Sequence, residues 1–255
     1  MLINFLYIVS IALMFVAAGI AVAVFRRRIK FLHGVTASAG ALVLSFIVSI
    51  WHENITTGTN IINKMLDEGF DLFFERAELI GNDEVKQLFA SISAEDLALV
   101  KDLYSMTFPA FLILYMLLIS YIGYMIIKRI VSLFKVDISA HPLFSELKLS
   151  RSASLALVVV GAVSFYRIEG IVTAAFLNIG IIIGGVAAVC GLSILDSSIR
   201  KRVRSSWLRF FLYAAVLFLT LPIFQTITFT LIFIAIADSF FNFRRLGLQE
   251  AKSDG

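Results

Sequence analysis

"WLRFFLYAAVLFLTLPIFQTITFTLIFIAIADSFFNF", residues 207–243, is an almost uninterrupted apolar run that contains a single acid, Asp238. As one straight helix these 37 residues would extend about 55 Å, whereas the hydrocarbon core of a bilayer is about 30 Å thick. Pro222 lies near the middle of the run. We therefore predict a tight helical hairpin with two spans, residues 206–221 and 223–241. One long, kinked helix is the alternative.

The whole chain has the composition of an integral membrane protein. Hydrophobic residues make up 60% of its 255 residues, the mean hydropathy is +0.93, and 16% of residues are charged, whereas a soluble domain carries about a quarter. These values exclude a soluble domain, and the number of apolar segments excludes a secreted domain behind a signal peptide. The five further candidate spans are residues 3–25, 31–51, 106–127, 152–166 and 171–195.

The sequence therefore predicts an all-α fold: a polytopic transmembrane helical bundle of about seven spans with a helical extracytoplasmic loop. We expect one transmembrane domain over residues 1–246, with residues 52–105 as the loop within it. Residues 247–255 form a short polar cytoplasmic tail. The single cysteine, Cys190, excludes an internal disulfide and a cysteine–histidine metal cluster.

The basic residues orient these spans. Clusters follow the first, third, fifth and seventh spans, at residues 26–30, 128–151, 200–204 and 244–245. If the N-terminus lies outside and there are seven spans, all four clusters lie on one side, and basic residues concentrate on the cytoplasmic side. We therefore predict a multi-pass protein of the bacterial cytoplasmic membrane with its N-terminus outside and its C-terminus in the cytoplasm. Six spans would place Arg244 and Arg245 outside.

Residues 52–105 form the large outer loop and carry 11 acids and 4 bases. The spacing of apolar residues over 62–80 predicts an amphipathic helix. Ser93 and Asp96 have the spacing of a capping box, which predicts a second helix that runs into the third span, with Pro109 at its entry. The pair is either a lid over an outward-facing cavity or two helices that rest on the bilayer surface.

Three polar residues are candidates for solute binding. Asn178 lies deep in the fifth span, where burying a polar group costs free energy, so it contacts either a neighbouring helix or a ligand. Arg167 and Glu169 bracket the outer turn "FYRIEG". They are either a solvated turn or the mouth of an outward-facing cavity.

Small residues four positions apart predict close helix packing. Gly180 and Gly184 form such a pair in the fifth span, and Ala17 and Ala21 form another in the first. The alanine pair is also a candidate for docking a partner subunit.

The acids near the cytoplasmic span ends require partners. Asp238, Asn242 and Arg245 fall on one helical face, and Asp196 with Arg200 at i+4 repeats the arrangement in the fifth span. The helix dipole disfavours a carboxylate at this end. Asp238 either pins the last span to the basic cytoplasmic loops or reaches the headgroup layer without a specific role.

No motif for catalysis is present. The sequence lacks a glycine-rich phosphate loop and the H-E-x-x-H and G-x-S-x-G patterns, and His33, His52 and His141 are scattered. We expect no enzyme activity, no cofactor, no metal and no nucleic-acid partner.

Three stretches carry a family resemblance. "HPLFSELKLSRSASL" at 141–155, "NIGIIIGGVAAVCGLSILDSSIRKR" at 178–202 and "IAIADSFFNFRRL" at 234–246 resemble, in order and spacing, segments of the YybS-like family of bacterial inner-membrane proteins of unknown function. The family is similar in layout to the substrate-binding S components of energy-coupling-factor vitamin transporters. The resemblance implies about eight spans and assigns no ligand-binding residue.

Two functions follow as expectations. The first is a small-solute-binding transporter component that acts with a second membrane subunit or an ATPase-linked partner, because no ATPase motif lies on this chain. The alternative is a non-transporting scaffold or regulator that works through helix–helix contacts in the lipid bilayer.

Overall fold

In the computed structural model the chain is helical. The structure describes residues 2–26, 29–79, 93–133, 144–164, 171–203, 205, 207–209, 211–212 and 224–243, and no strand occurs among these residues. The contacts divide the chain into two compact units, unit 1 at residues 1–139 and unit 2 at residues 140–255. The all-α prediction is confirmed, and one domain over residues 1–246 stays a prediction.

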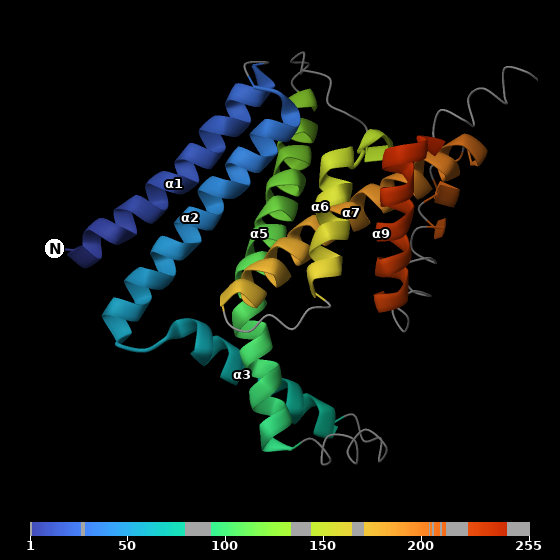
Figure 1. The fold of residues 1–255 in the computed structure, drawn as a ribbon. Coiled ribbons are helices and arrows are strands. Elements are labelled where there is room, and N and C mark those ends of the chain that lie inside the picture. The colour runs from blue at the N-terminus through green and yellow to red at the C-terminus, as the bar shows by residue number, and fades with distance from the viewer. Residues whose placement is uncertain are drawn as a thin grey trace, which may run out of the picture. The chain divides into compact units, whose positions relative to one another are not determined.

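The described residues of unit 1 form the helices α1 at Leu2–Phe25, α2 at Phe31–Thr57, α3 at Ile61–Leu79 and α5 at Ala94–Leu133 (Figure 1). α2 continues six residues beyond the predicted span and ends at Gly58, whose φ of 67° is in the left-handed region that glycine adopts readily. The predicted helix at 62–80 is confirmed as α3.

α1 and α2 form an antiparallel hairpin held by small residues. The Ser10 hydroxyl bonds those of Ser45 and Ser49, at 3.0 and 2.7 Å, and the Ser38 hydroxyl donates to the Ala17 carbonyl at 3.2 Å. Ser10 pairs with Ser45 and Ser49, and Ala17, further along α1, pairs with Ser38, earlier on α2. This order is the one expected for a single antiparallel interface. Such contacts need closely spaced backbones, which only small side chains permit.

Aromatic residues join the closed end of this hairpin to α5. The Phe25 ring stacks on Tyr124 at a centroid distance of 4.6 Å, and Phe31 meets the same ring edge-on at 4.7 Å. Val24, Val35 and Tyr124 are buried around this contact. The cluster fixes α5 against both ends of the α1–α2 turn.

α5 is one continuous helix of 40 residues, about 60 Å long. The Ser93 hydroxyl accepts from the Asp96 N–H at 3.0 Å, and the Asp96 carboxylate accepts from the Ser93 N–H at 3.3 Å. The predicted capping box is confirmed. Pro109 lies inside this helix, so the predicted outer helix and the third span are one element, and a bend at Pro109 stays a prediction.

Unit 2 contains a short 3₁₀ helix, η1, at Phe144–Glu146, followed by α6 at Arg151–Ser164, α7 at Ile171–Arg202 and α9 at Phe224–Phe241. Its apolar core consists of Leu149, Ala187, Cys190 and Ala235, so it draws on the segment before α6, on α7 and on α9. A Cβ at Gly191 would collide with the Leu231 backbone, with the carbonyl carbon 2.8 Å away. α7 and α9 therefore touch at a glycine.

Within the described part of the chain, four helical segments are long and apolar enough to cross a membrane: Phe5–Phe25, Phe31–Thr57, Glu95–Leu133 and Val172–Arg202. Two shorter apolar helices, Arg151–Val163 and Thr226–Phe241, correspond to the predicted fourth and last spans. Most of the predicted span 206–221, and Pro222 with it, lies outside the described residues. About seven spans and the hairpin therefore stay predictions.

Candidate functional site

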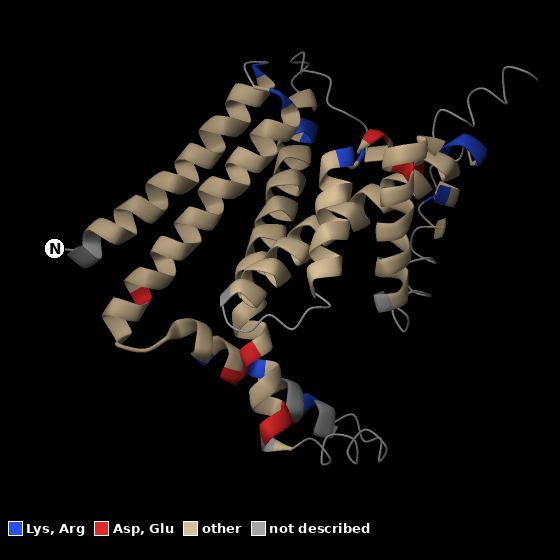
Figure 2. Cartoon of the chain, in the orientation of Figure 1, with Lys and Arg blue, Asp and Glu red and all other residues tan. Residues whose placement is uncertain are grey.

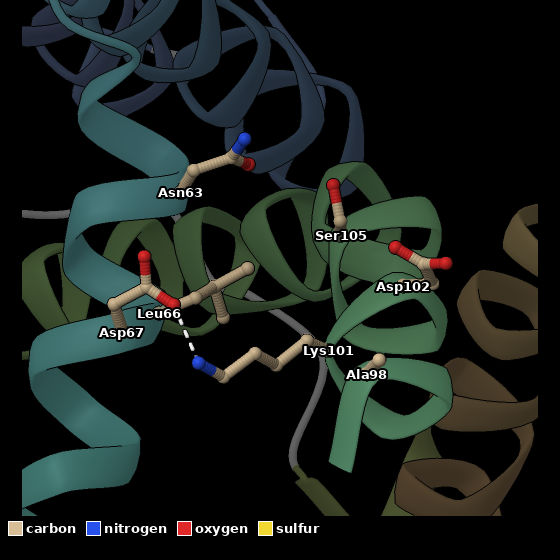
Figure 3. A pocket seen from close by; sticks show the side chains of 7 residues that line it. All are labelled: Asn63, Leu66, Asp67, Ala98, Lys101, Asp102 and Ser105. Atoms are coloured by element: carbon tan, nitrogen blue, oxygen red, sulfur yellow. Dashed lines mark hydrogen bonds and ion pairs between the residues drawn. The ribbon is translucent and has the colours of Figure 1, made fainter. Parts of the chain in front are cut away.

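Unit 1 contains a pocket of about 300 Å³ between α3 and the first turns of α5 (Figure 3). The amphipathic spacing of α3 turns Leu66 toward α5, and the capping box fixes where α5 begins. The lining residues are mostly polar: Asn63, Leu66, Asp67, Ala98, Lys101, Asp102 and Ser105.

Lys101 pairs with one of the two carboxylates that line this pocket. Its ammonium donates to the Asp67 carboxylate at 2.6 Å, and Asp102 lines the pocket from the next position of α5. The same ammonium lies 5.7 Å from the centre of the Phe70 ring, which meets Tyr104 edge-on at 5.9 Å. The pocket is thus lined by one positive and two negative groups.

These contacts make α3 and the outer part of α5 a pair. α3 also contacts α2, to which it is joined by a short turn. The Asn54 side chain supports that turn by accepting from the Ile61 N–H at 2.9 Å. Whether the pair is a lid or rests on the bilayer stays a prediction.

In unit 2, five polar side chains are buried toward one end of the helices. Their exposed fractions are at most 4%: Ser154, Ser193, Asp196, Asp238 and Ser239. The Ser154 hydroxyl donates to the Ser239 hydroxyl at 2.7 Å, which donates to the Ile236 carbonyl. These bonds attach the start of α6 to the end of α9.

α7 joins this polar end through the segment before α6. The Ser193 hydroxyl donates to the Leu147 carbonyl at 2.8 Å. One turn further along α7, the Asp196 carboxylate accepts from the Arg200 guanidinium at 2.8 Å. The Asp196 side chain is 5% exposed and Arg200 41%, so the pair reaches from the buried end to its surface. The sequence-predicted Asp196 and Arg200 are thus brought together.

The end of α9 is capped by residues that precede and begin α6. Asn242 has a φ of 54°, a left-handed conformation that asparagine tolerates, and its N–H donates to the Asp238 carbonyl at 2.9 Å. The Lys148 ammonium donates to the Asn242 side-chain oxygen at 3.0 Å, and Arg151 donates to the Ser239 carbonyl at 3.3 Å. Cations at a helix C-terminus also complement its dipole.

Of the two partners predicted for Asp238, the structure describes Asn242, and the predicted grouping stays a prediction. Asn242 leaves the helix, so its side chain accepts from Lys148 and the helical spacing from Asp238 no longer applies to it. Arg245, the other predicted partner, lies outside the described residues. Asp238 itself is 1% exposed, so it is buried and does not reach solvent within this unit.

Of the three predicted solute ligands, the structure describes Asn178, and the predicted solute site stays a prediction. The Asn178 amide is half-buried and donates to the Ala174 carbonyl of its own helix at 2.7 Å. Arg167 and Glu169 lie outside the described residues.

The predicted packing residues contact neighbouring helices. Ala17 is 7% exposed and faces Ser38 of α2, while Ala21 is half-buried on α1. A Cβ at Gly180 would meet Val160 of α6 at 3.1 Å, and one at Gly184 would meet Ile232 of α9 at 3.6 Å. The two glycines thus face two different helices.

Sequence reasoning missed the residues that define both sites. Lys148 and Arg151 fall in the predicted basic cluster at 128–151, Ser154 in the predicted fourth span, and Asp67 and Lys101 in the predicted outer loop. A signal was available in the run "KLSRSAS" at 148–154, where polar and basic residues lead directly into an apolar helix. Among the described residues no group of three or more His, Cys, Asp or Glu side chains could hold a metal ion.

Comparison with known proteins gives a family. Residues 1–238 match the family model described as "Predicted membrane protein (DUF2232)". No curated protein and no solved structure matches the chain. The model covers 238 of 255 residues and both units, and the apolar helices place the protein in a lipid bilayer. The chain belongs to the DUF2232 family of predicted membrane proteins.

Proposed function

We propose that the protein is a transporter component of the bacterial cytoplasmic membrane that binds a small solute and acts with a separate energising partner. The observation that carries the proposal is the pocket between α3 and α5, whose volume of about 300 Å³ is at the lower end of the range for small-molecule sites. The YybS-like resemblance and its layout, similar to substrate-binding S components, support the same reading. We also propose that the protein is not an enzyme.

The lining favours a small polar solute that carries an amine. Asp67 and Asp102 are acceptors for an ammonium group, while Lys101, Asn63 and Ser105 offer donors to a carboxylate or hydroxyl. A zwitterion or a short amine therefore matches the pocket better than an anion, because the lining has two acids for one base.

The proposal requires the pocket to face outward. With about seven spans and the N-terminus outside, the basic clusters lie in the cytoplasm and α3 lies outside. A cysteine placed at Asp71 is then labelled in intact cells by a membrane-impermeant reagent, and the buried Cys190 gives little background. Labelling only after the membrane is broken would refute this orientation.

Solute binding is tested with the purified full-length chain and a panel of amino acids and short amines. A true ligand at a hundred times its Kd stabilises the fold by about 2.7 kcal/mol, which a thermal-shift measurement detects. Asp102→Asn and Lys101→Gln should abolish that shift. Lys64→Gln is the matched control, because Lys64 lies on α3 outside the pocket, 3.7 Å from Glu68.

A scaffold or regulator is the second candidate. It is favoured by buried serines that bond neighbouring helices. Purification in mild detergent separates the two candidates. A second membrane subunit that co-purifies, with no thermal shift from any solute, favours the scaffold.

A further inference from the structure

Two basic segments that lie about a hundred residues apart meet at one end of unit 1. Arg26 and Lys30 flank the turn between α1 and α2, and Lys128 and Arg129 lie near the end of α5. Figure 1 shows that turn beside the end of α5. The buried ring of Tyr124, one helical turn before Lys128, holds the two segments together.

Aromatic contacts of Tyr124 hold the two basic segments together. Tyr124 stacks on Phe25, the residue before Arg26, and meets Phe31, the residue after Lys30, at centroid distances of 4.6 and 4.7 Å. Ile29 and Met125 pack against the same cluster. Arg26, Lys30 and Lys128 therefore adjoin, along the chain, residues of an aromatic contact that the tertiary structure creates, and Arg129 follows Lys128 on α5.

The described residues at this end of unit 1 include no acid. Residues 1–52 and 103–136 contain no aspartate or glutamate. Figure 2 shows the same separation within the described part of the unit, with basic positions at the α1–α2 turn and the end of α5 and acidic positions toward α3. The electrostatic potential at this end is consequently positive and attracts anions.

The N-terminus of α2 lies in the same place. A helix leaves its first backbone N–H groups without intrahelical partners and carries a partial positive charge there. Lys30 is the N-cap residue and its side chain makes no capping hydrogen bond. A 27-residue helix thus presents its N-terminus beside four cations, an arrangement that suits a phosphate.

We propose that this end of unit 1 binds the phosphate headgroup of an anionic phospholipid of the inner leaflet. A lipid fits better than a free anion because large apolar side chains adjoin the cations. Leu32 on α2 and Ile126 on α5 are each 54% exposed, which gives the acyl chains a surface. Basic sites at the cytoplasmic ends of membrane helices recognise such headgroups.

The test uses the full-length protein in neutral detergent, with phosphatidylglycerol as probe and phosphatidylcholine as the neutral comparison. Native mass spectrometry counts the retained lipids, and thermal unfolding measures their stabilisation. Phosphatidylglycerol should be retained and should raise the unfolding temperature, whereas phosphatidylcholine should do neither. This measurement is independent of membrane orientation and of the solute pocket.

Two double variants locate the site. Arg26→Gln with Lys30→Gln, and Lys128→Gln with Arg129→Gln, should each weaken retention roughly thirtyfold, because one cation near a charged surface contributes about a factor of five. Lys201→Gln with Arg202→Gln at the end of α7 is the matched control and should retain the lipid. Lys128→Arg should also retain it, which distinguishes lost charge from lost folding.

Three results would overturn the proposal. The first is equal stabilisation by phosphatidylcholine. The second is retention by both glutamine double variants that equals that of the control. The third is full competition by millimolar inorganic phosphate, which would show that the acyl chains contribute nothing.

Discussion

The two units bury different kinds of polar group. The buried polar side chains described in unit 1 are hydroxyls: Ser10, Ser38, Ser45 and Thr107. Unit 2 buries serines and also two carboxylates, Asp196 and Asp238. A hydroxyl can satisfy itself by donating to a single carbonyl, whereas a carboxylate only accepts and must find a donor. The carboxylates consequently lie at the end of unit 2 where Lys148, Arg151 and Arg200 are available.

The largest change in stability is expected at the close helix contacts made by Gly191 in unit 2 and Gly34 in unit 1. Gly191→Ala in unit 2 should lower the free energy of unfolding by about 3 kcal/mol, because the new Cβ meets the rigid Leu231 backbone. Gly34→Ala in unit 1 should cost about 1 kcal/mol, because its Cβ meets a Val24 methyl that can shift and because alanine favours a helix. Equilibrium unfolding in mixed micelles measures both.

Gly184→Ala is the control for this comparison. Its nearest neighbour, a methyl of Ile232, would be at an ordinary 3.6 Å, so the variant should be neutral or slightly stabilised. Gly184→Leu should still destabilise more than Gly247→Leu in the tail. Equal effects of alanine at Gly191 and Gly184 would refute the close contact of α7 and α9.

The second prediction concerns the carboxylates that distinguish unit 2. Asp238→Ala should lower the free energy of unfolding by about 2 kcal/mol and should lower the expression yield. Asp238 is 1% exposed, so its removal leaves the buried polar groups around it without a hydrogen-bond partner. Asp196→Ala should cost only about 1 kcal/mol, because Arg200 is 41% exposed and can be hydrated once its partner is lost. Thermal unfolding and expression level are the measurements.

Asp238→Asn sharpens this test, since it preserves the shape and removes the charge. A smaller loss than for Asp238→Ala would indicate that hydrogen bonding outweighs charge at this position. If Asp238→Ala left the stability unchanged, the hypothesis that Asp238 pins the last span would be refuted.

The third prediction compares hydroxyls between the units. Ser45→Ala and Ser239→Ala should each cost about 1 kcal/mol, because each breaks a buried bond between two helices. A double-mutant cycle of Ser154 and Ser239 should give a coupling of about 0.6 kcal/mol. Additive effects of the two substitutions would contradict a direct bond between α6 and α9.

The smallest effect is expected for the ion pair of the outer pocket. Asp67→Asn should cost about 0.5 kcal/mol, because its side chain is 59% exposed and surface pairs contribute little. The loss should shrink further in high salt. A cost above that of Ser45→Ala would show that the α3–α5 pair supports the fold of unit 1.

The sequence by itself determined the helices and their environment. Apolar length predicted α1, the third span and α7, amphipathic spacing predicted α3, and the pair Ser93 and Asp96 predicted where α5 begins. These features are local: hydropathy over about 20 residues and a capping bond over three positions suffice for them.

Only the tertiary structure decided which faces meet. The helical period placed Gly180 and Gly184 on one face, but it cannot say that Val160 of α6 covers one and Ile232 of α9 the other, or that Gly191 makes the closest contact. Lys148 reaches Asn242 across 94 residues because Asn242 leaves the helix, which helical spacing cannot anticipate. Partner choice depends on the packing of distant segments, whereas a helix depends on its own sequence.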